Sequence, residues 1–553
     1  MKKSILFLFF AILLISNSMN GKVFPAKEPL IVFHFDFNSV SLSENYVRLW
    51  LKKAADMGYN SVLWEIEDEV KWETCPESAS PDAFSKDTFR NILKYSRELG
   101  LESIPLLQTI GHAEYVLQHE KYKSFREDST RYDCYCTTNP QVGIFLKKWI
   151  DEYLDLFGDI RYFHLGGDEA YAFASCPKCK QRVNEIGKNG LYVEYIKDLS
   201  QSILEKGIRP GIWSDMILKY PNEIGGLNKE FVIWDWNYWD GDETPNRVMV
   251  WSKGGRISKG ELSSSILYDF PEIINASGEL NAFYTSDALK RLGYDVILCS
   301  SSRSHGDAVF AGKNESHVNN IIGAAKKTIK TGLLGNCVTS WAVRVHNHET
   351  QEPWLYLAPL TLKNPSLSKK ELLEKTSEHI FGVNNSDFFK IANQIGYSFP
   401  FANENSTGIM WTGMKDSKPA PEKYTQELIG KLKSGNRWNA AVESIKKSTE
   451  IVSDGITELN KYIPSAKRGM GAIYSWQRAG YFQYWQSIIA NEIVNTSKGK
   501  LGIPADKMIK LIELIKKEYK NWAENWMTPV SAEQNTSLIY DAVQNYFRQN
   551  LTD

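Results

Sequence analysis

The residues best suited to chemistry are two adjacent carboxylates, Asp168 and Glu169, at the end of Arg161-Tyr-Phe-His-Leu-Gly-Gly-Asp-Glu-Ala170. Neighbouring side chains of a strand point to opposite faces. Two consecutive acids can therefore enter one cleft only where a strand ends, and Gly166 and Gly167 let the backbone twist there. The pattern predicts an active site with carboxylate chemistry. The alternative is a solvated Asp-Glu turn, so the interpretation depends on the rest of the chain.

Short β-rich runs alternate with amphipathic segments of helical period through the first two thirds of the chain. The runs are residues 30–35, 61–65, 102–107, 162–165, 209–213, 231–236, 295–299 and 333–340. A strand followed by a helix, repeated eight times, predicts the α/β class and a (β/α)8 TIM barrel.

The β pattern stops after residue 353, and the remaining segments have only helical periodicity. The predicted helices are residues 369–376, 422–434, 438–459, 465–494, 505–526 and 532–551. The sequence thus predicts a catalytic barrel over residues 22–360 and an all-helical C-terminal domain over residues 361–553, packed on the barrel. The stretch 238–290 is long for one barrel connection, and it could either cover the site or be a plain insertion.

Polar and aromatic side chains recur where the predicted strands end, which is where function gathers in such barrels. Besides Asp168 and Glu169, the candidate site residues are His34, Asp68, His112, His164, Trp213, Asp215, Trp234, Trp236, Tyr238, Trp341 and Arg344. Each alone could be structural, but so many buried carboxylates would be costly without a purpose. Carboxylates with aromatic walls and few cations are typical of glycosidic bond cleavage.

Composition is consistent with a glycan as the partner. The net charge is −1 and the basic residues are dispersed, so neither nucleic acid nor an anionic membrane surface is indicated. The 17 Trp and 27 Tyr could stack on sugar rings, although a large core uses them too.

The first 21 residues have the pattern of a secretory signal: Met1-Lys2-Lys3, an apolar run over 4–15, and small polar residues. The run is short for a bilayer span, and no later segment looks transmembrane. We expect an exported protein, periplasmic or extracellular.

Four of the seven cysteines, Cys134, Cys136, Cys176 and Cys179, are paired at a spacing that suits either a structural zinc or disulfides, with Cys75 as a further disulfide partner. Unrelated thiols are the third alternative. None of these makes the cysteines catalytic, and no cofactor is expected for catalysis.

The segment His164-Leu-Gly-Gly-Asp-Glu169 resembles the acid motif of glycoside hydrolase family 20, the β-N-acetylhexosaminidases. Further segments resemble the hexosaminidase D branch of that family. They are Glu65-Ile-Glu-Asp68, Pro105-Leu-Leu-Gln-Thr-Ile-Gly-His112, Trp213-Ser-Asp-Met, Val232-Ile-Trp-Asp235, and Thr339-Ser-Trp341 followed by Arg344. The resemblance covers roughly residues 30 to 360, in register and in order.

The resemblance implies exo-acting, retaining hydrolysis of terminal β-linked GlcNAc or GalNAc, with the substrate's own acetamido oxygen as nucleophile. It implies that Glu169 is the general acid and later the base, while Asp168 polarises the acetamido N–H. It further implies that Asp68 and His112 form a supporting polar pair. By the same resemblance Trp213 and Trp234 line the acetamido pocket, and Trp341 lies under the sugar.

The sequence departs from better-known family members where hydroxyl groups are recognised. His34-Phe-Asp36 replaces a first-strand arginine, Val343 replaces an acid, and Tyr238 is the remaining candidate for bonding the acetamido oxygen. The choice between GlcNAc and GalNAc therefore stays open. Two alternatives are a non-catalytic sugar-binding barrel and a retaining glycosidase with a covalent carboxylate nucleophile such as Glu67.

Overall fold

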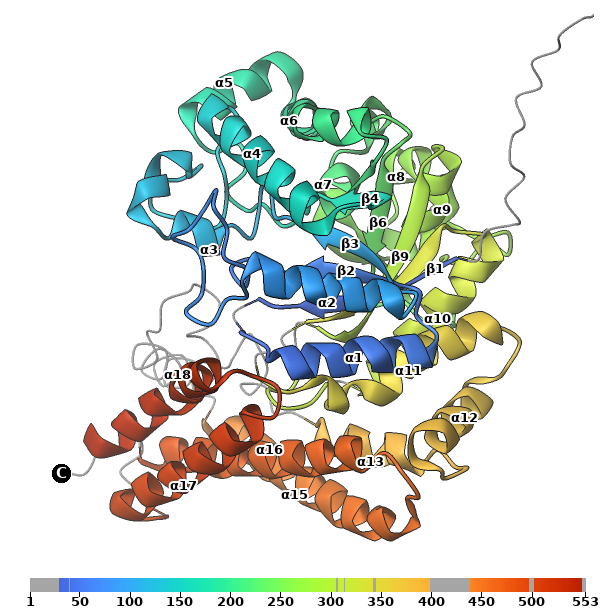
Figure 1. The fold of residues 1–553 in the computed structure, drawn as a ribbon. Coiled ribbons are helices and arrows are strands. Elements are labelled where there is room, and N and C mark those ends of the chain that lie inside the picture. Colours follow the sequence, from blue (N-terminus) through green and yellow to red (C-terminus); the bar gives the residue numbers. More distant parts are fainter. Residues whose placement is uncertain are drawn as a thin grey trace, which may run out of the picture.

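Eight parallel strands form a closed barrel in the computed structural model, which describes residues 29–38, 40–304, 307–312, 314–341, 345–397, 438–496 and 502–549 (Figure 1). The strands are β1 (Leu30–Asp36), β2 (Ser61–Glu65), β3 (Glu102–Leu106), β4 (Tyr162–His164), β5 (Arg209–Trp213), β6 (Val232–Trp236), β9 (Asp295–Arg303) and β10 (Gly335–Ser340). They pair in the order β1-β10-β9-β6-β5-β4-β3-β2, and each pair is parallel. The TIM barrel predicted from the sequence is confirmed.

Strand alternation decides which side chains face the barrel interior. On β1, Ile31 and Phe33 pack in the outer core, whereas Leu30 and Val32 belong to the inner cluster. His34 shares the parity of Val32 and therefore points inward at the carboxyl end of the strand. The same alternation on the other strands directs a ring of polar and aromatic side chains into the mouth of the barrel.

Helices surround the barrel, and local signals set where they begin. The helices of this region are α1 (Glu44–Met57), α2 (Lys86–Glu98), α3 (Glu114–Leu117), α4 (Pro140–Phe157), α5 (Pro177–Ile186), α6 (Lys188–Glu205), α7 (Asp215–Leu218), α8 (Ser264–Asp269), α9 (Tyr284–Arg291), α10 (Asn314–Thr331) and α11 (Glu352–Lys363). Ser43 and Ser85 cap α1 and α2 through their side chains, and Asn139 caps α4 with Pro140 in its first turn. These caps fix the residues at which the helices begin, and so they also fix where the preceding loops, which carry site residues, end.

The long connection between β6 and β9 contains a small antiparallel hairpin, β7 (Arg247–Val250) and β8 (Gly255–Ser258), followed by α8. Its indole Trp251 packs against Trp236 at the barrel mouth, with ring centroids 4.6 Å apart. The insertion therefore contributes to one wall beside the candidate site.

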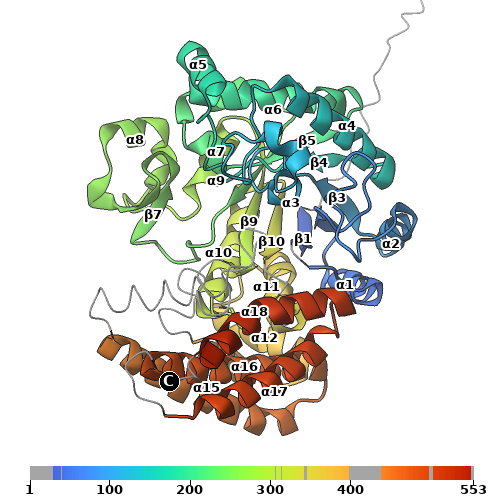
Figure 2. The same ribbon diagram turned by 90° about the vertical axis from the view of Figure 1, so that its left-hand side faces the viewer.

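The C-terminal region is helical and packs against one side of the barrel, beneath α11 and α10 (Figures 1 and 2). Its helices are α12 (Lys369–Phe381), α13 (Asp387–Ile395), α15 (Trp438–Tyr462), α16 (Met470–Thr496), α17 (Ala505–Ala523) and α18 (Pro529–Gln549). Trp354 packs on Trp476 at 5.4 Å, and the Tyr519 hydroxyl donates to the Val345 carbonyl at 2.7 Å. The predicted helical second region is confirmed, although the predicted helix over 422–434 and the predicted signal over 1–21 lie outside the described residues.

Within the described ranges, no helix is both long and apolar enough to span a bilayer.

Candidate active site

A buried polar network joins the carboxyl ends of β1, β2 and β3. The Glu65 carboxylate contacts His34 Nε2 at 3.0 Å and accepts a hydrogen bond from the Gln108 amide Nε2 at 2.8 Å. His34 Nδ1 accepts the backbone N–H of Ser340 at 3.3 Å, so β10 joins the same network. The side chains of His34, Glu65 and Gln108 are almost fully buried. This network forms the floor of the site.

The backbone just after β2, β3 and β4 adopts left-handed conformations at residues other than glycine. Glu67 has φ 34°, His112 has φ 53° and Glu169 has φ 41°. Such residues are uncommon and cost free energy, and they gather where side chains must be aimed at a site. A side chain on Gly111 would meet the Asp168 carbonyl at 2.3 Å, so the loops after β3 and β4 touch closely there.

Asp168 and Glu169 both face one imidazole nitrogen. His112 Nε2 lies 3.4 Å from Asp168 Oδ2 and 3.6 Å from Glu169 Oε2. Burial lowers the pKa of His112, but the charge of Asp168 and its hydrogen bond outweigh burial and raise that pKa well above its ordinary value. His112 therefore carries a proton at neutral pH and provides a positive charge beside both acids.

The two acids differ in their access to solvent. The Asp168 side chain is 12% exposed, and its Oδ1 is buried without a hydrogen-bond partner among the described residues. The Glu169 side chain is 37% exposed. Asp168 is thus set to bind a polar group of a ligand, while Glu169 can reach a group at the mouth of the site.

Asp215 supports the loop that carries Glu169. Its Oδ2 accepts the Glu169 backbone N–H at 3.2 Å and contacts Lys219 Nζ at the same distance. Burial raises the pKa of Asp215 to about 6, although the charge of Lys219 opposes that shift. Asp215 therefore positions Glu169 through the backbone.

Asp68 and Glu67 follow β2 on the other side of the mouth. Burial raises the pKa of Asp68 to about 6, and burial followed by the charges of Glu65 and Asp68 raises the pKa of Glu67 well above its ordinary range. The Glu67 carboxylate accepts from Asn38 Nδ2 at 3.1 Å. The hydrogen bonds and ion pairs of the described residues join His112 to Asp168 and Glu169, and the expected pair of His112 with Asp68 is not among them.

Two of the four tryptophans predicted at the site, Trp213 and Trp234, lie together around His164. The His164 ring is 4.5 Å from Trp213 and 5.0 Å from Trp234, and both indoles are almost fully buried. His164 Nδ1 accepts the Gly166 N–H at 2.9 Å, and burial followed by the charge of His34 lowers the pKa of His164 well below its ordinary value. His164 is therefore neutral and turns the backbone toward Asp168.

Trp341 and Tyr238 form the more open aromatic wall. Trp341 is half-buried, lies 4.6 Å from the His34 ring and 6.2 Å from Trp213, and donates its indole N–H to the Tyr238 hydroxyl at 3.0 Å. Tyr238 packs in turn on Trp236 at 5.4 Å. These rings, tilted relative to one another, form an aromatic wall at the mouth of the barrel. Arg344, the remaining predicted site residue, lies outside the described residues.

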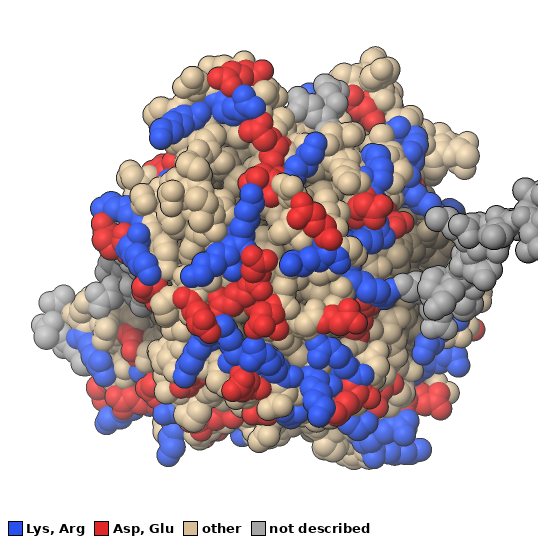
Figure 3. Space-filling view, turned by 45° about the horizontal axis from the view of Figure 1, so that its top comes forward, with Lys and Arg blue, Asp and Glu red and all other residues tan. Residues whose placement is uncertain are grey.

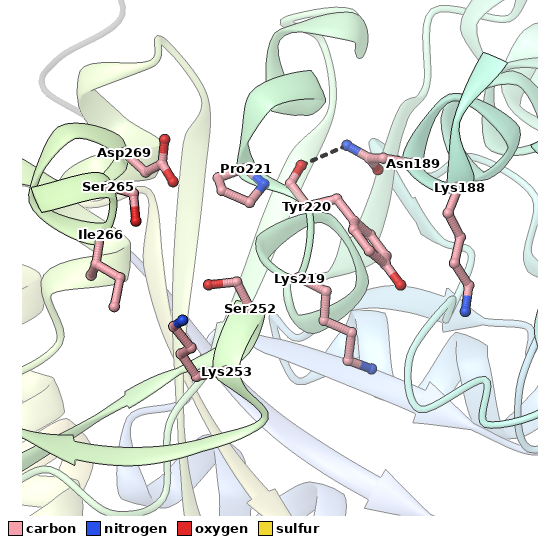
Figure 4. A pocket seen from close by; sticks show the side chains of 10 residues that line it. All are labelled: Lys188, Asn189, Lys219, Tyr220, Pro221, Ser252, Lys253, Ser265, Ile266 and Asp269. Carbon is pink, nitrogen blue, oxygen red and sulfur yellow. Dashed lines mark hydrogen bonds between the residues drawn. The ribbon is translucent and has the colours of Figure 1, made fainter. Parts of the chain in front are cut away.

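A cavity of about 380 Å³ adjoins the Asp215 side of the site and is shown in Figure 4. Lys188, Lys219, Tyr220 and Lys253 contribute to its lining, so Lys219 belongs both to this cavity and to the contact with Asp215. On the face shown in Figure 3, cationic and anionic side chains are interspersed.

Lys219 and Tyr171 were not among the predicted site residues. Lys219 stands four positions after Asp215, a spacing that brings two helical side chains together and could have indicated the pair. Tyr171 is 65% exposed, and its hydroxyl interacts with Glu169, but an exposed tyrosine near an acid is no signal by itself.

The cysteines form a different group from the one expected. Cys136, Cys176 and Cys179 converge with the Glu127 carboxylate, whereas the Cys134 thiol contacts the Tyr135 carbonyl instead. In this group the Glu127 carboxylate stands where Cys134 was expected. Glu127 stands nine positions before Cys136 and gave no spacing signal.

A barrel with paired acids and aromatic rings at its carboxyl end has the architecture of a glycoside hydrolase domain. Residues 47–255 match the model described as glycosyl hydrolase family 20, catalytic domain. The matched segment contains β2 to β6 with Asp168 and Glu169, which confirms the resemblance predicted from the acid motif.

Three curated relatives are similar over part of their length. Lacto-N-biosidase of Bifidobacterium bifidum is 26% identical over 215 residues, which are 36% of this chain and 18% of that protein. Human hexosaminidase D is 28% identical over 218 residues, 37% of this chain and 44% of that protein. Bovine hexosaminidase D is 26% identical over 190 residues, 32% of this chain and 55% of that protein. The chain thus spans between about a fifth and about half the length of these relatives.

Two solved structures that match this chain are a chitobiase of Flavobacterium johnsoniae and a β-N-acetylhexosaminidase of Bacteroides fragilis, the former at 16% identity. The chitobiase match covers 91% of this chain and 77% of that chain with a TM-score of 0.44. A β-N-acetylhexosaminidase from Bacteroides fragilis also has 16% identity, covers 60% of this chain and 65% of that chain, and has a TM-score of 0.43.

Proposed function

We propose that this protein is an exo-acting, retaining β-N-acetylhexosaminidase that removes terminal β-linked GlcNAc or GalNAc from glycans by substrate-assisted catalysis. The family 20 match over the segment that carries the acids supports hydrolysis of this class of bond. The observation that carries the mechanism is that Asp168 and Glu169 stand side by side against one protonated imidazole.

The geometry divides the two acids into two roles. Glu169 is accessible and donates a proton to the leaving oxygen, and it later accepts one from the attacking water. Asp168, whose buried Oδ1 is free for a ligand, accepts the acetamido N–H as the acetamido oxygen bonds to the anomeric carbon. The positive oxazolinium ion is thereby placed beside a carboxylate.

His112 balances the charge of this arrangement. Its imidazole lies 3.4 Å from Asp168 and 3.6 Å from Glu169, so its positive charge offsets part of the negative charge of both carboxylates.

A covalent enzyme nucleophile is the less supported alternative. Glu67 is one candidate, but burial followed by the charges of Glu65 and Asp68 raises its pKa well above its ordinary value and so disfavours the ionised form that a nucleophile needs. A purely sugar-binding barrel is also less supported, because binding alone gives no reason for left-handed backbone at three residues that follow three neighbouring strands.

Sugar binding would use the half-open aromatic wall. Trp341 lies under the ring of the terminal sugar, and its bond to Tyr238 places a phenol hydroxyl within reach of the acetamido oxygen. Trp213 and Trp234 hold this wall from below and line the acetamido pocket together with His164.

The proposal also includes export to the periplasm or the exterior, supported by the charged and apolar pattern of residues 1–21. It divides the chain into a catalytic barrel over 22–360 and a helical domain over 361–553. Signal cleavage between residues 21 and 22, read from the N-terminal sequence of secreted protein, tests the first boundary.

The experiment that tests the function is hydrolysis of nitrophenyl β-GlcNAc, β-GalNAc and β-glucoside by purified protein. We expect turnover of one or both acetamido sugars and a far lower kcat/KM for the glucoside. A thiazoline that mimics the cyclised intermediate should inhibit tightly because it resembles the intermediate more than the substrate. Equal rates on the glucoside would contradict the proposed mechanism.

A second specificity is motivated by the relative named lacto-N-biosidase. A nitrophenyl lacto-N-bioside included in the same assay distinguishes release of a disaccharide from release of one sugar. Turnover of the disaccharide substrate alone would replace the exo-acting part of the proposal.

A further inference from the structure

A sulfur-rich cluster lies beside the proposed active site, between the loops that follow β3 and β4. Glu127 and Cys136 come from the first loop, and Cys176 and Cys179 come from the start of α5 in the second. Their four ligand atoms all lie within 4.8 Å of one another, and Glu127, Cys136 and Cys179 are buried. No catalytic role uses these groups.

The spacing of the sulfur atoms matches the edges of a metal-centred tetrahedron. Cys136 Sγ is 3.7 Å from Cys176 Sγ and 3.8 Å from Cys179 Sγ. With a Zn–S bond of about 2.3 Å, the edge of a tetrahedral thiolate site is about 3.8 Å. A disulfide instead requires sulfurs about 2.05 Å apart. The thiols are therefore placed at the separation that a shared ion requires.

The carboxylate completes the fourth corner. Glu127 Oε2 is 3.2 Å from Cys179 Sγ, while Glu127 Oε1 accepts the Cys176 backbone N–H at 2.8 Å. That second bond holds the carboxylate with one oxygen directed at the sulfurs. Thiolate and carboxylate oxygen are both established zinc ligands, and four protein ligands make a closed site.

Groups around the cluster are arranged to stabilise thiolates. The Cys179 N–H donates to Cys176 Sγ at 3.3 Å, as expected where a Cys-x-x-Cys pair begins a helix. The Thr138 hydroxyl lies 3.2 Å from Cys179 Sγ and 3.6 Å from Cys136 Sγ. Such outer contacts orient metal ligands and favour their charged form.

We propose that Glu127, Cys136, Cys176 and Cys179 bind one divalent ion of the zinc type in a closed structural site. Binding displaces the protons of the three thiols, which leave to solvent, and no group is oxidised or reduced.

The ion would fasten the two loops that carry the catalytic groups. The loop bearing Cys136 is joined to the end of β3, because Tyr135 donates its N–H to the Ile110 carbonyl at 3.0 Å, two residues before His112. Cys176 stands seven residues after Glu169 in the same loop, which follows β4. The site is thus a positioning element for His112 and Glu169, and its metal content can be measured independently of activity.

The first test uses the full chain, expressed and purified without chelators. Elemental analysis should find about one zinc per chain, X-ray absorption should show three sulfur ligands and one oxygen ligand, and the denatured intact mass should show no disulfide. Absence of zinc, a mass lower by the two hydrogens of a disulfide, or a set of four sulfurs would each overturn the proposal.

The second test compares substitutions. Cys136→Ser and Glu127→Gln should each lower the zinc content by at least tenfold after dialysis against a mild chelator. Cys134→Ser is the matched control, because this buried thiol belongs to the same loop but contacts the Tyr135 carbonyl, and zinc should be retained. Equal loss from the control and the ligand variants would contradict the assigned ligand set. Should a ligand variant fail to fold, the wild-type measurements still decide the proposal.

Discussion

Buried acids distinguish the mouth of the barrel from the C-terminal helices. In the barrel, Asp168 and Asp215 are buried with at least one oxygen lacking a protein partner, and further buried acids lie around them. In the described part of the helical region, the buried acid is Glu492, and its carboxylate accepts the backbone N–H groups of Gly502 and Ile503.

This difference separates a structural acid from a functional one. The two backbone hydrogen bonds satisfy the buried Glu492 carboxylate, so its burial costs the helical region little free energy. Asp168 keeps an unsatisfied oxygen beside strained backbone, a cost that a bound substrate would offset. The comparison predicts that removing charge at the barrel mouth lowers activity more than stability, and the following experiments test that in order of effect.

The largest effect is expected for Asp168→Asn. The change removes the charge that faces the oxazolinium ion and should cost about 3 kcal/mol of transition-state stabilisation, more than a hundredfold in kcat/KM. Steady-state kinetics on a nitrophenyl N-acetylhexosaminide measure the loss. Asp159→Asn, an exposed acid on the same part of the chain, is the control and should retain activity. A loss below tenfold would remove Asp168 from the mechanism.

The next effect is expected for Glu169→Gln. Without the acid, activity should fall by about a hundredfold or more on substrates with poor leaving groups and by less on activated aryl glycosides, because the latter need little protonation. Rates on a natural disaccharide and on a nitrophenyl glycoside give the comparison, with Glu243→Gln as an exposed control. Equal losses on both substrates would contradict the acid role.

A smaller effect, confined to one limb of the pH profile, is expected from His112. Its raised pKa means that the imidazolium is present below that pKa and is lost as pH rises through it. Activity should therefore fall on the alkaline side. In Asp168→Asn that limb should move to lower pH, since Asp168 provides the main upward shift. Stability gained from His112 should likewise fade as pH rises, and an unchanged alkaline limb would contradict the contact.

The smallest effect on activity and a measurable one on stability are expected for Asp215→Asn. Burial raises the pKa of Asp215 to about 6, so wild-type stability falls as pH rises from about 4 to about 6, where the unfolded chain ionises first. The asparagine variant lacks this loss, so its stability relative to wild type should improve across that window by up to about 3 kcal/mol. Urea unfolding at pH 4 and pH 7 measures the free energy of unfolding of both proteins. A difference between variant and wild type that does not change with pH would show that burial does not raise the pKa of Asp215.

Sequence reasoning succeeded where local rules decide the structure. The strands were found because short β-rich runs that alternate with segments of helical period are local signals. The acid pair was found because Gly166 and Gly167 indicate the end of β4.

The contacts between loops could not be found in this way. The approach of His112 to Asp168 depends on left-handed backbone at His112 and on the close passage of Gly111, neither of which leaves a period in the sequence. Glu127 joined the cysteines for the same reason, since tertiary packing of two loops brought it there. The hydrogen bond between Tyr238 and Trp341 crosses the long connection that starts at residue 238, and the sequence indicated only the length of that connection.

The claim that the substrate's acetamido group is the nucleophile is tested most directly by varying its acyl group. The measurement is kcat/KM for nitrophenyl glycosides whose N-acetyl group carries zero, one, two or three fluorines. Fluorine withdraws electrons from the carbonyl oxygen, so an attack by that oxygen predicts a steep fall in log kcat/KM with each fluorine added. A flat series would contradict the account and would point to a carboxylate of the protein as the nucleophile.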